Sequence, residues 1–127
     1  MQRDVINAED APAPVGGYAQ AVSVRGATRT LYVSGQIPVD AEGRCPASFE
    51  DQCRLAWRNV LAQLAAADMT VENLAKVTIF LSDRRFALEN RAIRQQVLGE
   101  HRPAMTVIIT GIFDEAWLLE IEAVAVA

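Results

Sequence analysis

The sequence contains few of the residues that build metal and disulfide sites. Its 127 residues include only two cysteines, Cys45 and Cys53, and one histidine, His101, which form no cluster along the chain. A protein zinc site needs three or four Cys, His or carboxylate ligands, so the sequence predicts no metal site. A Cys45–Cys53 disulfide is the alternative to two reduced thiols, and we expect reduced thiols because disulfides are rare in the cytoplasm.

Several other features are absent, and each absence excludes a class of protein. The seven glycines lack the spacing of a nucleotide-binding or dinucleotide-binding loop, so we expect no cofactor. No apolar run approaches the roughly 20 residues of a membrane helix, and the N-terminal residues lack the apolar segment of a signal peptide. The net charge is −4 and the basic residues are scattered, which argues against a nucleic-acid partner. We therefore expect a cytoplasmic protein that binds neither membranes nor nucleic acid.

The residues that are present describe one globular domain. A chain of 127 residues with 51% apolar content can build one hydrophobic core, and the apolar surplus indicates buried subunit contacts. Apolar residues at spacings of three and four predict helices that follow Ser48 and Ser82, the second ending near Gly99. Alternating or β-branched runs predict strands at 4–7, 18–24, 30–34, 75–81, 104–110 and 117–126.

The order of these elements predicts an α+β fold. A mixed sheet with two helices packed on one of its faces is the simplest arrangement of three strands, a helix, a strand, a helix and two strands. A turn through residues 25–28 would pair strand 18–24 with strand 30–34 as a hairpin. Gly35 lies within an apolar run, which indicates a bulge or a place where a ligand approaches the backbone closely.

Three polar side chains fall on stripes that are otherwise apolar. In the last strand a period of two places Glu120 and Glu122 on one face with Val124. A carboxylate there is costly to desolvate unless something pairs with it or uses it, and the pattern alone favours a wet sheet edge over a catalytic group. Asn90 shares a helix stripe with Ile93 and either bonds a neighbouring loop or organises a pocket; the pattern alone favours the loop.

Six stretches taken together resemble the Rid family of imine and enamine deaminases, also called the YjgF family. The resemblance covers nearly the whole chain, in the order of the family, at residues 11–20, 33–39, 77–83, 86–90, 102–104 and 120–125. It implies a single domain over residues 1–127 with a fold like that of chorismate mutase, in which two helices cover one face of a mixed six-stranded sheet. It also implies a homotrimer whose sheets form an internal barrel and whose ligand clefts lie between subunits.

The resemblance also implies a chemistry and a set of site residues. Family members add water to the imine carbon of a reactive 2-imino or 2-enamino acid, and ammonia leaves to give the keto acid. A carboxylate on the last strand orients the water or moves a proton, and the matching residue here is Glu120. The positions that match or adjoin the family's ligand-binding residues are Tyr18, Ser34, Gly35, Asn90, Met105 and Thr106.

One position departs from the family. An arginine that follows Pro-Ala grips the substrate carboxylate in the archetypal members, and this chain has Met105 there. A thioether cannot pair with a carboxylate, and the loss of such a contact costs up to several kcal/mol in affinity (about 2 to 5). Arg102 is a possible substitute, but a strand residue three positions away faces the opposite side, so a surface role is favoured for it.

Two functions follow from this combination of matches and one mismatch. The first is a Rid-type hydrolase acting on imines or enamines, with a substrate preference altered by Met105. The alternative is a trimeric protein that binds a small molecule in the same cleft without turning it over. A ribonuclease role attached to parts of this family is the weakest, because the chain is acidic and has no basic patch.

Overall fold

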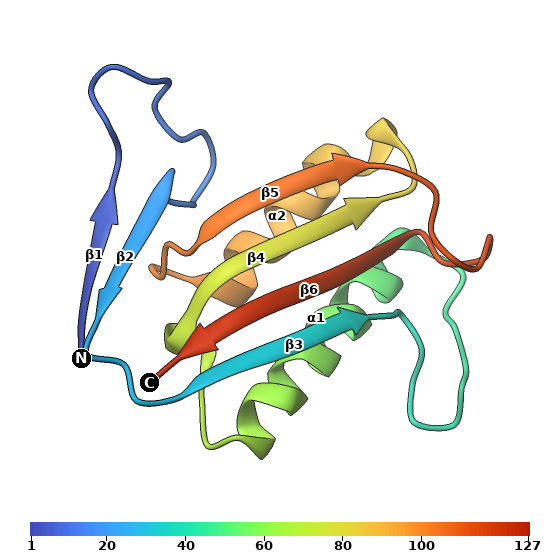
Figure 1. Ribbon diagram of the computed structural model, residues 1–127. Helices are drawn as coiled ribbons and strands as arrows, with labels where there is room; N and C mark the ends of the chain where they lie inside the picture. The colour runs from blue at the N-terminus through green and yellow to red at the C-terminus, as the bar shows by residue number, and fades with distance from the viewer.

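The computed structural model describes residues 1–127 and consists of a sheet with two helices on one face (Figure 1). Short 3-10 turns, η1 (Val71–Asn73) and η2 (Arg84–Phe86), precede β4 and α2. The α+β fold class predicted from the element order is therefore confirmed. The main elements are β1 (Gln2–Ile6), β2 (Ala21–Arg25), β3 (Thr30–Gln36), α1 (Phe49–Ala66), β4 (Leu74–Leu81), α2 (Ala87–Leu98), β5 (Ala104–Ile109) and β6 (Leu119–Val126).

Four of the strands form one mixed sheet in the order β3-β6-β4-β5. β4 and β5 are parallel, whereas β6 runs antiparallel to both of its neighbours, β3 and β4. β3 and β5 are consequently the two edges of this sheet. The antiparallel pair β1–β2 stands beside the start of β5 (Figure 1), where it is joined to the sheet by a parallel bridge between Ala19 and Ala104.

The predicted hairpin between strands 18–24 and 30–34 is wrong. β2 pairs with β1, and β3 pairs with β6 from Thr30 to Val33 and again at Gln36. The turn after β2 contains Gly26 at a φ of 73°, and the backbone N–H groups of Thr28 and Arg29 then both donate to the carbonyl of Ala127. These bonds direct the chain onto the end of β6, which offers a longer and more buried partner than β2.

The hydrophobic core lies between the sheet and the two helices. Because side chains alternate along a strand, Val77 and Ile79 of β4 and Ile121 of β6 point toward the helices and are fully buried. They pack with the apolar stripe of α1, which includes Trp57 and Leu64. Full burial of one such aliphatic side chain contributes about 1.5 to 3 kcal/mol to the free energy of unfolding. No helix of the chain is long and apolar enough to cross a membrane.

The opposite face of the sheet, called the open face below, carries no helix (Figure 1). The alternate residues of the same strands lie on it, among them Phe80 of β4 and Glu120 of β6. Large apolar and aromatic groups are exposed here and on the β5–β6 connection: Tyr32 is 79% exposed and Phe113 is 95% exposed. Exposed apolar groups that lie close together are common at surfaces where proteins contact one another.

Candidate functional site

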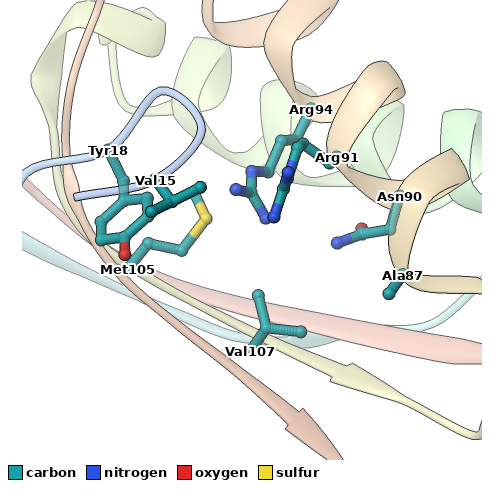
Figure 2. Close-up of a pocket in the computed structure, with 8 residues that line it drawn as sticks. All are labelled: Val15, Tyr18, Ala87, Asn90, Arg91, Arg94, Met105 and Val107. Carbon is teal, nitrogen blue, oxygen red and sulfur yellow. The ribbon is translucent and has the colours of Figure 1, made fainter. Parts of the chain in front are cut away.

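A cavity of about 270 Å³ lies between α2, β5 and the loop that precedes β2; we call it the helix-side pocket (Figure 2). Tyr18 comes from the loop, Asn90 from α2 and Met105 from β5, so the fold brings together three of the positions singled out in the sequence. The complete lining is Val15, Tyr18, Ala87, Asn90, Arg91, Arg94, Met105 and Val107.

Local rules explain why these side chains converge. On α2, Asn90 and Arg91 follow Ala87 by three and four residues, and Arg94 follows them by four and three, which places all four on one face of the helix. Met105 and Val107 alternate along β5, which directs both to the side of the sheet where α2 packs.

The loop that closes the helix-side pocket depends on a glycine. Gly16 has a φ of +93°, and a Cβ added to it would lie 2.9 Å from Nε of Arg91 and 3.2 Å from Nη2 of Arg94. Ala19 anchors the end of the loop, because its N–H donates to the carbonyl of Pro103 at 2.9 Å. A larger residue at position 16 would therefore force the loop and the arginines apart.

Asn90 is buried with an unused hydrogen-bond donor. The residue is 1% exposed, and its Oδ1 lies 4.0 Å from Sγ of Cys53, a weak donor behind it. Its Nδ2 has no partner, and Figure 2 shows this nitrogen pointing into the pocket. Buried amide groups are almost always hydrogen-bonded, so a free Nδ2 calls for a partner that enters the cavity. The helix pattern favoured a hydrogen bond from Asn90 to a neighbouring loop, but no such bond is present.

Arg94 is held in the pocket wall by the loop. It is 5% exposed, its Nη2 donates to the carbonyl of Gly16 at 2.9 Å, and its guanidinium lies 6.0 Å from the centre of the Tyr18 ring. Burial lowers the pKa of Arg94, and the positive charge of Arg91 lowers it further. Nε of Arg94 has no hydrogen-bond partner.

No acidic side chain pairs with Arg91 or Arg94. Arg91 is half-buried beside Arg94, and both guanidinium groups approach the same point at Gly16. Neither arginine is among the site residues predicted from the sequence, although their spacing from Asn90 on one helix face is a signal that could have identified them. The ion pairs of the chain are Arg25–Asp4, Arg44–Asp40, Arg44–Glu42 and Arg54–Glu50.

Glu120 lies on the open face, on the other side of the sheet from the helix-side pocket. Its carboxylate rests against the backbone of Gly35, where an added Cβ would lie 2.3 Å from Oε2. The register of β3 and β6 shifts between Val33 and Gln36, so the bulge predicted at Gly35 is present. Glu120 belongs to none of the ion pairs, and it borders a second cavity of about 230 Å³ with Phe80, Thr110, Gly111, Ile112 and Phe113.

The remaining site residues of the sequence analysis are also outside the helix-side pocket. Ser34 is exposed on β3, the edge of the sheet opposite to β5. Thr106 accepts a hydrogen bond from Nζ of Lys76 at 2.7 Å and alternates with Met105, so it lies on the open face. One subunit thus holds two groups: Tyr18, Asn90 and Met105 on the helix side, and Ser34, Gly35, Thr106 and Glu120 on the other.

Arg102 does not reach the helix-side pocket in which Met105 lies. Its Nη1 donates to the carbonyls of Gly99 at 2.7 Å and His101 at 3.1 Å, at the C-terminal end of α2. Cations stabilise that end of a helix, so Arg102 acts there as a cap. It lines neither the helix-side pocket nor the cavity beside Glu120.

The two cysteines are free, and no metal-ligand cluster is present. Burial raises the pKa of the Cys53 thiol to about 12, which makes it an unreactive core residue. Cys45 is half-buried on the connection before α1. The chain contains no group of three or more His, Cys, Asp or Glu side chains that could hold a metal ion.

Comparison with known proteins relates this chain to one family. The family model described as Endoribonuclease L-PSP matches residues 8–127. Escherichia coli TdcF, a putative reactive intermediate deaminase, is 32% identical over 128 residues, covering 98% of this chain and 97% of its own. The 2-iminobutanoate/2-iminopropanoate deaminase of Rattus norvegicus is 35% identical, with 98% of this chain and 90% of its own covered.

Solved structures agree with these matches. The structure of Escherichia coli TdcF with bound serine is 33% identical and superposes with a TM-score of 0.73, covering 98% of each chain. The Rid-family protein YyfB of Yersinia pestis has the same fold at a TM-score of 0.87 over 100% of each chain, with 24% identity. The chain described here therefore belongs to the Rid family, the family of the Endoribonuclease L-PSP model.

Proposed function

We propose that this protein is a Rid-type hydrolase that releases ammonia from reactive imines or enamines. The observation that carries the proposal is the position of Glu120, whose unpaired carboxylate lies against Gly35 at the edge of a cavity. Relatives that are 32% and 35% identical are named as deaminases of reactive intermediates and of 2-imino acids, which supports a deaminase-like role.

The chemistry needs one group that accepts and returns a proton. Glu120 takes a proton from water as the water oxygen bonds to the imine carbon, and it passes this proton to the nitrogen as the C=N bond becomes single. Glu120 then takes the hydroxyl proton of the resulting carbinolamine and passes it to the nitrogen as the C–N bond breaks. Ammonia and a carbonyl product leave, and Glu120 ends in its starting state.

A complete site requires two subunits. The helix-side pocket lies at the β5 edge, whereas Ser34 and Gly35 lie on β3 at the other edge of the sheet. In a ring of three copies, one edge of each subunit meets the other edge of its neighbour, since such an interface is heterologous. We therefore infer a homotrimer with its ligand clefts between subunits. Its formation would also cover exposed groups of the open face such as Tyr32.

Met105 alters the substrate preference in this proposal. The side chain lines the helix-side pocket together with Val15 and Val107, so this part of the wall is apolar. An apolar wall favours substrates with a short aliphatic side chain and gives a carboxylate nothing to bond. The substrate must therefore be held by other groups of the site.

The test is release of ammonia and keto acid from imines that an amino-acid oxidase generates in situ. A panel of amino acids is supplied to the wild type and to Glu120→Gln, with light scattering to measure the oligomer. We expect the wild type, as a trimer, to accelerate hydrolysis of at least one imine and Glu120→Gln to lose that acceleration. A verified turnover that Glu120→Gln leaves unchanged would falsify this mechanism.

Met105 favours a second candidate, a trimeric binding protein without turnover. In that case the protein binds a small molecule in the same cleft, and no imine of the panel is hydrolysed faster than in its absence. Measurable catalysis on any imine excludes this alternative.

A further inference from the structure

We propose that Arg91 and Arg94 form an anion site in the helix-side pocket that binds the carboxylate of a small organic acid with a short aliphatic chain. The proposal rests on the proposed function in one respect: it identifies the bound acid as the 2-imino acid substrate or its 2-keto acid product. The site itself follows from charge, unused donors and cavity shape.

The charge of the pocket is uncompensated. Arg91 and Arg94 are three residues apart on α2, an arrangement in which like charges on one helix face repel each other. Both lie close to Gly16, and neither belongs to an ion pair. Arg94 is buried, Arg91 is half-buried, and neither has a carboxylate of its own, so this part of the pocket favours an anion from outside.

Unused donors surround the same space. Asn90 and Arg94 are more than nine-tenths buried, yet Nδ2 of Asn90 and Nε of Arg94 have no hydrogen-bond partner. Arg94 is fixed by its bond to Gly16 and by the ring of Tyr18. Figure 2 shows the two guanidinium groups in the pocket, with the amide nitrogen of Asn90 pointing toward them. An oxygen anion is the ligand that these donors fit, and guanidinium groups bind planar carboxylates in a bidentate manner.

The rest of the lining selects among anions. The cavity of about 270 Å³ has room for a ligand of only a few heavy atoms, and Val15, Ala87, Met105 and Val107 supply apolar walls. Inorganic phosphate would satisfy the donors but leave these walls without a partner. A carboxylate attached to a short aliphatic chain uses both parts of the pocket.

The experiment is calorimetric titration of the full chain with 2-ketobutyrate. 2-Butanone is the ligand control because it keeps the ketone and the ethyl group but lacks the carboxylate. Arg91→Gln is the test variant, and Arg85→Gln is its matched control because Arg85 is exposed on η2, outside the pocket. We expect the wild type and Arg85→Gln to bind 2-ketobutyrate equally, Arg91→Gln to bind it at least about tenfold more weakly, and 2-butanone not to bind.

Three results would overturn the proposal. Equal affinity of Arg91→Gln and the wild type would remove Arg91 from the site. Tighter binding of inorganic phosphate than of 2-ketobutyrate would mean that the pocket does not select a carboxylate with an aliphatic chain. Dissociation of the oligomer in Arg91→Gln, measured by light scattering, would show that the arginines pair with a neighbouring subunit instead.

Arg94→Lys provides a second variant, since Arg94 also holds the loop at Gly16. We expect Arg94→Lys to weaken 2-ketobutyrate binding while keeping a cooperative thermal transition. The outcome is independent of the hydrolase test. Binding through Arg91 without any ammonia release supports the anion site and contradicts the hydrolase; turnover that Arg91→Gln leaves unchanged, without 2-ketobutyrate binding, supports the hydrolase and contradicts the anion site.

Discussion

The helix-side pocket and the Glu120 region differ in nearly every physical property. The first is positively charged, lies on the helix-covered face of the sheet and contains buried donors without partners. The second carries an unpaired carboxylate on the open face, against a bulge of the β3 edge. A group that holds an anion and a group that moves a proton have opposite electrostatic needs. The two regions are separated within one chain, and only the homotrimer proposed above would bring them together.

The two regions also use different scaffolds. Arg91 and Arg94 take their positions from the regular spacing of α2, and the carbonyl of Gly16 in the loop holds Arg94 from outside. Glu120 takes its position from the alternation of β6 and from the missing side chain of Gly35. The helix-side pocket is therefore sensitive to charge and to loop packing, whereas the Glu120 region is sensitive to one close backbone contact.

The largest expected effect comes from Glu120→Gln. We expect the rate of imine hydrolysis to fall about 10² to 10⁴-fold, because the amide cannot accept the proton of water. Affinity for 2-ketobutyrate should change by less than about threefold, since Glu120 is not part of the helix-side pocket. Single-turnover assays and calorimetry measure the two quantities. A parallel loss of both would contradict the division of labour between the regions.

Gly35→Ala should have the next largest effect. The new methyl group would lie 2.3 Å from Oε2 of Glu120, so the carboxylate must move away from its position. We expect the hydrolysis rate to fall about tenfold or more with little change in melting temperature, since the displaced atoms are the end of a flexible side chain. When Gly35→Ala is added to Glu120→Gln, the hydrolysis rate should fall no further than in Glu120→Gln alone. A double-mutant cycle measures this difference.

Relocation of one positive charge tests the helix-side pocket. Arg91→Gln is expected to weaken 2-ketobutyrate binding, and Met105→Arg in the same background should restore about tenfold of it, because both side chains line one cavity. Calorimetric titration with 2-ketobutyrate, with acetate and phosphate as competitors, measures how much of the affinity is recovered. Failure of Met105→Arg to restore binding, in a protein that melts like the wild type, would place the anion away from β5.

Met105→Leu has the smallest expected effect and serves as the control for that experiment. The exchange keeps the volume and the apolar character of the wall, so we expect a loss of less than about 1.5 kcal/mol in the free energy of unfolding. Affinity for 2-ketobutyrate should change less than about twofold. A much larger loss of affinity would mean that the thioether itself contacts the ligand.

Much of the fold could be predicted from local patterns in the sequence. The alternation in residues 117–126 places Glu120 and Ile121 on opposite faces, as the structure shows. Ser48 was expected to cap the helix that follows it, and its side chain accepts a hydrogen bond from the N–H of Asp51 at 3.1 Å. Gly99 ends α2 at a φ of 58°, a conformation that glycine adopts easily. Each of these features depends on neighbours only a few residues away.

Strand pairing was not predictable in the same way. The run that became β2 could pair with either neighbour in sequence, and the choice depended on β6, which lies about a hundred residues further along the chain. Arg91 and Arg94 could not be recognised as buried pocket residues for a similar reason. Arginines on a helix are ordinarily solvated, and these are enclosed only because a loop 78 residues away in sequence folds onto α2 at Gly16.

The sequence by itself determined the α+β class, the faces of the helices and strands, and the family. These depend on residue type, periodicity and motif order, which the chain carries in linear form. Only the tertiary structure decided that Asn90 has a free donor, that two arginines share its pocket, and that Glu120 lies across the sheet from Met105. Such properties arise from contacts between segments far apart in sequence. Only the folded chain shows which polar groups have hydrogen-bond partners and which charges have counter-charges.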